Sequence, residues 1–291
     1  MRKKAVSILI AAMAFAGLLA GCGGAQEPGA EVSSGAAGDE NQDADSPAAG
    51  SPAVYMTTDI SSDGLTAVYE ALQASPEGKI AVKLSTGEPG SNYLRTELIG
   101  ELVQSFDEAT IVECNTAYGG SRASTAMHYQ VAEDHGYTEI ADVDIMDEEG
   151  SMTLPVAGGA NLEENYVGSH FADYDYYVVL SHFKGHSMAE AGKSVADYLD
   201  GNIVYINVMN RLSVDCDCDG NPAEPDMHDI GILASYDPVA LDQACVDLVY
   251  SAQDGNSLVE RIESRNGLHT LEHAEEIGLG SRTYELVNID G

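Results

Sequence analysis

Short apolar runs alternate with amphipathic stretches from residue 53 to the end of the chain. The apolar runs have the length of β-strands, and the amphipathic stretches have the period of α-helices. The predicted strands cover residues 80–84, 110–114, 142–146, 176–180, 203–208, 230–234 and 285–289. The predicted helices cover residues 64–74, 93–106, 122–135, 188–199, 238–251, 257–265 and 270–277.

The run Tyr176-Tyr177-Val178-Val179-Leu180 is apolar without alternation. Such a strand has both faces covered, because a solvent-exposed face would bring in polar residues at every second position. Strands that alternate with helices are typical of β-α-β units. The pattern therefore predicts an α/β fold, with a mostly parallel sheet and helices on both faces. We see no internal repeat or second linker in residues 53–291, so we expect a single large domain.

Polar residues concentrate directly after several of the predicted strands. These polar segments are 85–92, 115–122, 181–186, 210–219 and 235–238. In a parallel sheet, the loops that follow the strands share one edge and can converge on one cleft. We therefore expect the chemistry of this protein at the carboxyl edge of the sheet.

The amino terminus resembles the export signal of a bacterial lipoprotein. A basic start is followed by an apolar run over residues 5–18, which is too short for a comfortable membrane-spanning helix. Leu19-Ala20-Gly21-Cys22 resembles a lipobox, which implies cleavage before Cys22 and lipidation of its thiol. An ordinary secretory signal is the alternative. We predict a signal peptide over residues 1–21 and a lipid anchor that holds the protein at the extracytoplasmic face of the cell membrane.

The lipidated cysteine and an acidic tether occupy residues 22–52. Residues 23–52 are mostly small and polar, with six acidic residues and no basic one. Such a segment cannot bury enough apolar surface to offset its ordering entropy. The folded domain is therefore expected over residues 53–291.

The formal charge of the chain is −35 at pH 7, and removal of the three cations of the signal peptide leaves −38. Nucleic acid and anionic lipid surfaces both bind basic proteins. We therefore expect no nucleic-acid partner, and membrane contact only through the lipid anchor. A charge of this sign keeps an exported protein soluble or gathers cations.

The run Asp215-Cys216-Asp217-Cys218-Asp219-Gly220 follows the predicted strand 203–208. Its carboxylates match the opening of a calcium loop, but Pro222 and Asp226 depart from the rest of that motif, so calcium is less favoured. The thiols suggest a transition metal or an iron–sulfur centre, and thiols without metal are the alternative. A bridge within the run would be strained, whereas a long-range disulfide to Cys114 or Cys245 would not.

Two further segments carry candidate binding groups. His182 and His186 lie on one predicted loop and can ligate a metal, while Lys184 between them can counter an anionic substrate. Surface histidines on a turn are the alternative. The glycine-bearing segment 115–122 leads into a helix, and its amides together with Arg122 can hold a carboxylate or phosphate. An ordinary helix start is equally compatible with this segment.

Several segments carry a family resemblance. They are 83–95, 113–122 with His128 and 135–137, Ser181-His182-Phe183-Lys184-Gly185-His186, Asp215-Cys216-Asp217-Cys218, and 229–244. In this order they resemble the bacterial family called domain of unknown function 362, whose members are often described as uncharacterised Fe–S centre proteins. The resemblance covers nearly all of residues 54–291. It implies an α/β fold and a metal or iron–sulfur site, but it does not imply a particular reaction.

The residues and the resemblance together give the candidate site residues. Those expected to bind a small anionic ligand are Lys83, Glu88, Asn115, Arg122, His128 and Lys184. Those expected to bind metal are Cys216, Cys218, His182 and His186. The chain departs from the family after His186, where a glycine-rich segment and a further loop are expected and the next helix follows directly. If the missing stretch lines the site, this copy is expected to bind metal weakly or to be inactive.

Two classes of function follow from these observations. The first is a lipid-anchored metalloprotein with an anion-binding cleft. The second is a non-catalytic surface module that binds a small ligand or a partner, which includes a degenerate family member that keeps only the fold. The residues alone leave open whether the protein is an enzyme.

Overall fold

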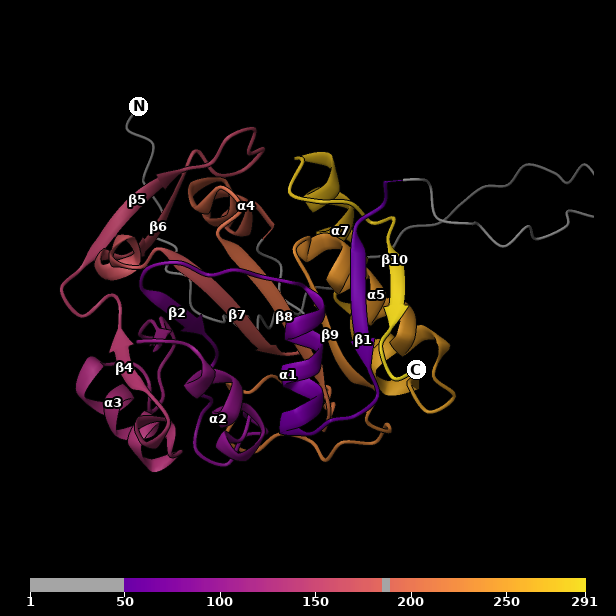
Figure 1. Cartoon of the computed structure of the whole chain (residues 1–291), viewed down its shortest axis with the longest axis horizontal. Helices are drawn as coiled ribbons and strands as arrows, with labels where there is room; N and C mark the ends of the chain where they lie inside the picture. Colours follow the sequence, from indigo (N-terminus) through magenta and orange to yellow (C-terminus); the bar gives the residue numbers. More distant parts are fainter. Residues whose placement is uncertain (1–49, 185–188) are drawn as a thin grey trace, which may run out of the picture.

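A computed structural model describes residues 50–184 and 189–291 of the chain. Within them, an eight-stranded sheet has the strand order β10-β1-β9-β8-β7-β2-β3-β4 (Figure 1). Its strands are β1 (Ala53–Thr57), β2 (Ile80–Lys83), β3 (Thr110–Glu113), β4 (Asp142–Ile145), β7 (Tyr176–His182), β8 (Ile203–Met209), β9 (Gly231–Ser235) and β10 (Glu285–Asn288). A separate antiparallel hairpin joins β5 (Ser151–Pro155) to β6 (Glu164–Gly168). Cys22 and His186 lie outside the described residues, so their predicted roles stay predictions.

The sheet is mostly parallel, as predicted. The pairs β1–β10, β2–β3, β2–β7, β3–β4 and β7–β8 are all parallel. Strand β9 alone runs the other way, because it pairs antiparallel with both β1 and β8. The loops after β2, β3, β7 and β8 therefore share one edge of the sheet, and the loop after β9 lies at the opposite edge.

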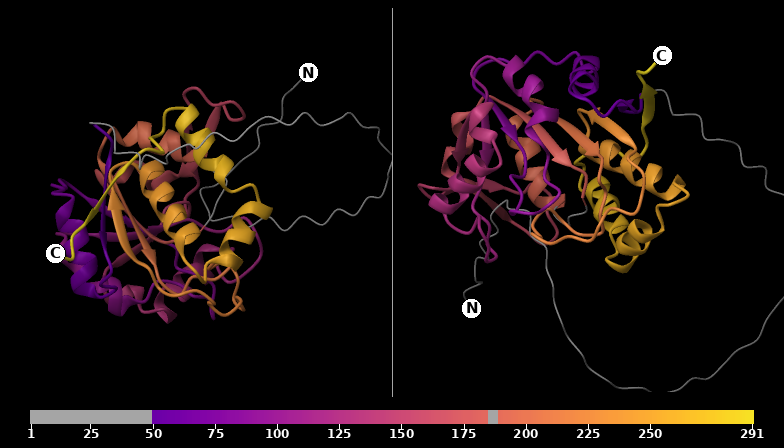
Figure 2. Two further views of the ribbon diagram at one scale, coloured as in Figure 1. Left: turned by 90° about the vertical axis from the view of Figure 1, so that its right-hand side faces the viewer. Right: turned by 90° about the horizontal axis from the view of Figure 1, so that it is seen from below.

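Helices cover both faces of the sheet, which confirms the predicted layers. The helices are α1 (Ser62–Ala71), α2 (Thr96–Ser105), α3 (Thr125–Asp134), α4 (Ala189–Leu199), α5 (Pro238–Ser251), α6 (Asn256–Ser264) and α7 (Leu268–Glu276). Figure 2 shows α1 on one side of the sheet and α5 and α7 on the other. In the part of the chain that the structure describes, no helix is both long enough and apolar enough to cross a membrane.

The central strands lack alternation because both of their faces are buried. Val178 and Leu180 of β7 pack in one core with Leu65 of α1. Tyr177 of the same strand faces the other way, into a core that includes Leu199 of α4. Most apolar positions of β7 therefore lose contact with water, and full burial of such side chains supplies about 1.5–3 kcal/mol apiece.

The helix α4 is tied to its neighbours through the carboxylate of Glu190, which is 5% exposed. The backbone amides of Asn161 and Leu162 donate to this carboxylate at 3.0 and 2.7 Å. His273 of α7 lies 2.8 Å from it through Nε2. Burial opposes the charge, but the hydrogen bonds from His273, Leu162 and Asn161 outweigh it and lower the pKa of Glu190 to about 2.

We expect the Glu190 carboxylate to make the free energy of unfolding depend on pH in the acidic range. Because the pKa of Glu190 is depressed on folding, its contribution is present above the pKa of the unfolded chain and is lost as pH falls towards 2. Between pH 5 and pH 2, the free energy of unfolding should fall by about 2 kcal/mol more in the wild type than in Glu190→Gln. Urea denaturation across this range measures the difference. The control is Glu164→Gln on strand β6, where the side chain is exposed. Parallel curves for the wild type and Glu190→Gln would contradict the assignment.

Candidate functional site

The loops after β2 and β8 are in direct contact at the carboxyl edge of the sheet. The amide of Glu88 donates to the carbonyl oxygen of Asp217 at 2.8 Å. Gly90 and Gly220 face each other so closely that a Cβ on Gly90 would overlap the carbonyl oxygen of Gly220. Gly90 also has a φ of +91°, a conformation that favours glycine. The sequence thus brings the Cys/Asp run beside the polar segment 85–92, as the parallel sheet predicted.

Arg122 is the centre of the polar network at this edge and is only 1% exposed. Its Nε lies 3.3 Å from Glu88, and its Nη1 lies 3.2 Å from Glu113. Nη1 also donates to the hydroxyl of Ser85 at 3.2 Å, and Nη2 donates to the hydroxyl of Tyr118 at 2.6 Å. The guanidinium therefore joins the loops after β2 and β3, and its nitrogens are occupied by groups of the protein itself.

Glu113 carries a buried charge at the end of β3. Burial opposes ionisation, but the charges of Lys83 and Arg122 outweigh it and lower the pKa of the Glu113 carboxyl. Lys83 Nζ lies 4.0 Å from this carboxylate and is about a quarter exposed. Of the two cations beside Glu113, Lys83 is therefore more exposed to solvent than Arg122.

Two other predicted ligand-binding residues hold the loops internally. The Nε2 of His128 lies 2.7 Å from the hydroxyl of Thr86, and the ring is fully buried. Burial is the main cause that lowers the pKa of His128, so the imidazole is uncharged at neutral pH. The side-chain amide of Asn115 donates to Thr125 at 2.9 Å and to Asp147 at 3.2 Å. Both residues support the wall of the site rather than face an opening.

His182 and Asp217 form a buried pair that links β7 to the Cys/Asp run. His182 Nδ1 lies 2.8 Å from the Asp217 carboxylate, and Nε2 lies 2.6 Å from the carbonyl oxygen of Asn210. Burial opposes the charge on Asp217, but the hydrogen bond and charge of His182, with the charges of Lys184 and Arg122, lower its pKa. Because both ring nitrogens have acceptors, His182 has no free nitrogen for a metal in this arrangement.

Lys184 contributes a buried ammonium to the same place. Its Nζ is shielded from solvent and has no hydrogen-bond partner among the residues that the structure describes. Burial is the main cause that lowers the pKa of Lys184, and the charges of Asp217 and Cys216 act in the opposite direction. A buried donor without a partner is costly, which makes Lys184 the best-placed cation for an incoming anionic group.

The thiols of Cys216 and Cys218 lie together on the turn after β8. The turn is closed by the amide of Asp219, which donates to the carbonyl oxygen of Cys216 at 2.9 Å. The amide of Cys218 also donates to the sulfur of Cys216 at 3.5 Å. The hydrogen bond to Cys216 and then burial raise the pKa of the Cys218 thiol. Both cysteines are half-buried, so the pair is reachable from solvent.

The other cysteines lie elsewhere. Cys114 directly follows β3 and is buried in one core, and Cys245 belongs to α5 and is fully buried in another. Neither forms a disulfide, and no disulfide joins Cys216 to Cys218. Of the two alternatives for these thiols, a long-range disulfide is therefore not formed among the described cysteines.

Comparison with known proteins identifies the family. The sequence model described as Domain of unknown function (DUF362) matches residues 80–195 and 190–247, which is more than half of the chain. The chain belongs to the DUF362 family. The two matched segments meet at residues 190–195, close to the point after His186 where the sequence departs from the family pattern. No curated protein and no solved structure matches this DUF362 chain.

The donor set of this DUF362 site does not fit a complete iron–sulfur cluster held by one chain. Such clusters take four thiolates, or two thiolates with two imidazoles. Of the cysteines that the structure describes, Cys216 and Cys218 lie at this edge of the sheet, and Cys114 and Cys245 lie in separate cores. The nitrogens of His182 are held by acceptors of the protein. Two neighbouring thiols do fit a single thiophilic metal ion that completes its coordination with solvent or a ligand.

The carboxylates of the run do not form a calcium loop. Asp215 accepts from the amide of Ala223 at 2.9 Å, and Asp217 pairs with His182. Asp219 accepts from the amide of Asn221 at 2.9 Å. The three carboxylates therefore point to different partners instead of one ion, which agrees with calcium being the less favoured metal.

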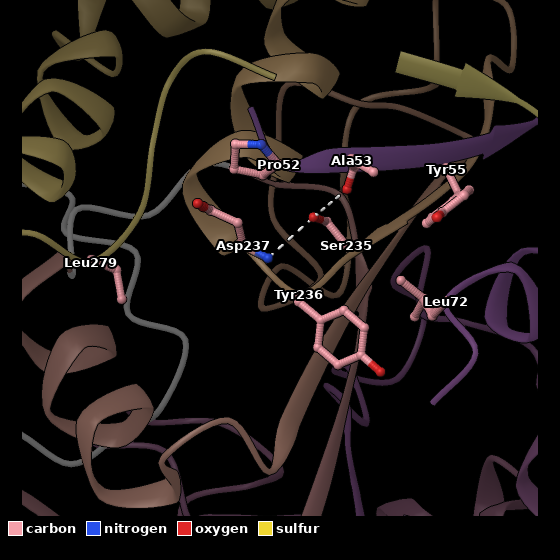
Figure 3. Close-up of a pocket in the computed structure, with 8 residues that line it drawn as sticks. All are labelled: Pro52, Ala53, Tyr55, Leu72, Ser235, Tyr236, Asp237 and Leu279. Atoms are coloured by element: carbon pink, nitrogen blue, oxygen red, sulfur yellow. Dashed lines mark hydrogen bonds between the residues drawn. The ribbon is translucent and has the colours of Figure 1, made fainter. Parts of the chain in front are cut away.

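The polar segment 235–238 lies at the opposite edge of the sheet from the Cys/Asp run, contrary to prediction. Because β9 runs antiparallel, its carboxyl end is at the edge where β1 begins. Ser235 donates to the carbonyl oxygen of Ala53 at 2.8 Å and accepts from the amide of Asp237 at 3.1 Å (Figure 3). A separate pocket of about 310 Å³ lies there, lined in part by Tyr236 and Leu72. Asp237 caps α5, so this segment has a structural role.

Sequence analysis missed other residues of functional interest. Tyr118 binds Arg122, and its position inside a polar segment gave no sign of this contact. Asp217 matches a position of the less favoured calcium loop in the sequence, whereas in the structure it pairs with His182. Another missed group comprises Asp144, Glu148 and His170, which could hold a metal ion in the described part of the chain.

Proposed function

We propose that this DUF362 protein is a lipid-anchored, extracytoplasmic protein that binds a thiophilic metal ion and a small anionic ligand in one cleft. The lipobox-like sequence before Cys22 supports the anchor, and the acidic tether supports a folded domain held away from the membrane. The single observation that carries the metal proposal is the pairing of Cys216 and Cys218, half-buried on one turn beside buried cations.

The two thiols would supply the metal ligands. Thiolates prefer metals such as zinc, iron and copper(I) over calcium or magnesium. Cys216 lies near Lys184, whose positive charge favours a thiolate. His182 could join the metal only if it gave up its bonds to Asp217 and Asn210. We therefore assign His182 a positioning role, in which it fixes the Cys/Asp run through Asp217.

The anionic ligand would pair with Lys184. Arg122 is saturated by Glu88, Glu113 and neighbouring hydroxyls, so it has little capacity for another anion. Lys184 lacks a hydrogen-bond partner in the described chain. A carboxylate or phosphate at this point would provide one and would also approach the thiols. Lys83 is the second, more exposed cation for such a ligand.

Metal analysis of the mature full chain, purified without oxygen, tests the proposal. We expect about one thiophilic metal ion per chain in the wild type and its loss in Cys216→Ser/Cys218→Ser, because both thiolate ligands are removed. The control Cys114→Ala removes a buried thiol from a separate core and should retain the metal. Metal content that is low in the wild type and unchanged in the double variant would contradict the proposal.

A second candidate is a non-catalytic module that binds a small anion or a partner without metal. The observation that favours it is the internal saturation of Arg122 and His182, whose hydrogen bonds hold the loops together. This alternative predicts an unchanged melting temperature after treatment with a chelator. It also predicts a rise in melting temperature with phosphate or a carboxylate, which is lost in Lys184→Met.

A further inference from the structure

A group of metal-ligating side chains lies on residues that the thiol cleft does not use. Asp144 of β4, Glu148 of the following turn and His170 of the 3₁₀ helix η2 (Ser169–Asp173) each offer one ligand atom. These atoms all lie within 4.8 Å of one another. Two carboxylates and one imidazole are typical ligands of divalent transition-metal ions.

The backbone fixes the positions of these three residues. The amide of His170 donates to the carbonyl oxygen of Met146 at 3.1 Å, which joins η2 to the end of β4. The amide of Glu148 donates to the carbonyl oxygen of Ile145 at 2.9 Å, which closes the turn. The ligand atoms therefore come from a strand and two segments held by hydrogen bonds, not from independent flexible loops.

Hydrogen bonds between side chains also orient the group. Tyr174 donates through its hydroxyl to one oxygen of Asp144 at 2.8 Å, and the other oxygen lies 2.9 Å from Nδ1 of His170. The Nε2 of His170 lies 3.8 Å from the carboxylate of Glu149. The bond from Tyr174 is a supporting contact of the kind that holds a carboxylate ligand in place at a metal site.

An ordinary surface pair in the same chain offers a comparison. His228 Nδ1 lies 2.7 Å from Asp254, but these side chains are 59% and 44% exposed. Those of His170 and Asp144 are only 20% and 17% exposed. In the described part of the chain, no third metal-ligating group joins the His228 pair. The His170 group is therefore more enclosed and has the additional carboxylate that a metal site needs.

We propose that Asp144, Glu148 and His170 bind one divalent transition-metal ion, separately from the thiol cleft. The ion would replace the proton shared by His170 and Asp144, and water would complete its coordination. It would tie η2 to the end of β4, an edge strand of the sheet. The charge of −35 on the chain favours accumulation of cations near such a site.

Mn²⁺ is the probe for this site, because it prefers oxygen and nitrogen ligands and thiolates do not select it. The mature full chain and its Cys216→Ser/Cys218→Ser variant are titrated with Mn²⁺, and the signal of free Mn²⁺ is followed by electron paramagnetic resonance. We expect about one bound Mn²⁺ in both proteins. In the double-serine background, His170→Ala and Glu148→Gln should each weaken the affinity about tenfold or more.

His228→Ala is the matched control, since it removes a histidine–aspartate pair without the third ligand. It should leave Mn²⁺ affinity unchanged. Glu148 is exposed, so Glu148→Gln remains informative even if His170→Ala does not fold. Unchanged affinity in Glu148→Gln would overturn the proposal. An equal loss of affinity in His228→Ala would also overturn it, because this would show general binding by the acidic surface.

Discussion

Arg122→Met is expected to lower the free energy of unfolding by about 3–5 kcal/mol, because it leaves buried carboxylates without their partner. Glu88 and Glu113 both bind the guanidinium, and both lie in the interior with Arg122. Methionine fills much of the same space but supplies neither charge nor donors. Urea denaturation of the full chain at pH 7 measures the loss.

A matched control comes from Arg261, which pairs with Asp215 at 3.4 Å but is 41% exposed. Arg261→Met should cost only about 0–1 kcal/mol, because water replaces the lost contact. Adding Glu88→Gln and Glu113→Gln to Arg122→Met should recover part of the stability, since the unpaired charges are removed. Equal costs for Arg122→Met and Arg261→Met would show that the buried network does not hold these loops.

The predicted helices and strands of the sheet agree with the structure because their burial leaves a clear periodic pattern. The run at Tyr176 is apolar throughout, and in the structure β7 has a helical layer on each face. Asp237 and Pro238 mark the start of α5, where the Asp237 carboxylate caps the first amides. Local signals of this kind are sufficient to place the elements.

Other parts of the fold were not predicted, because they depend on contacts distant in sequence. The direction of β9 is set by its pairing with β1 and β8, and its own apolar residues would suit either direction. Strand β1 (Ala53–Thr57) follows the tether and is short. The hairpin β5–β6 has mainly exposed or half-buried positions along β5, so its hydrophobic pattern is weak.

The sequence predicted which loops meet at the candidate site better than it predicted the contacts of their residues. The parallel strands bring the Cys/Asp run next to the segment 85–92, as expected. Whether a polar side chain faces a ligand or another protein group depends on its partners. Arg122 and His182 looked like ligand-binding residues, but their nitrogens are occupied by internal acceptors. Lys184, with a buried ammonium that lacks a described partner, better matches the expected role.

The internal contacts make the position of the thiols depend on the loop after β2. Cys216 and Cys218 flank Asp217, whose carbonyl oxygen accepts the amide of Glu88. Glu88 in turn binds Arg122. The approach of Gly90 to Gly220 allows these two loops to touch. A side chain at position 90 should therefore displace the turn that carries the thiols, although no polar residue around them is substituted.

Gly90→Ala is expected to lower the free energy of unfolding by about 2–3 kcal/mol, from the strained positive φ and the lost hydrogen bond between Glu88 and Asp217. The added Cβ would overlap the backbone of Gly220, so the loops must separate. Cys216 and Cys218 should then react faster with a thiol reagent. Urea denaturation and the rate of thiol modification measure the two effects.

Gly119→Ala is the matched control for Gly90→Ala, because a Cβ at Gly119 meets no atom within 4 Å. It lies in the neighbouring loop after β3 and should change stability by less than about 0.5 kcal/mol, with no change in thiol reactivity. If Gly90→Ala lowered stability but left the thiols equally reactive, the contact would be purely structural. The Cys/Asp run would then hold its geometry through its other contacts, such as the pair of His182 and Asp217, and the loop after β2 would have no part in presenting the thiols.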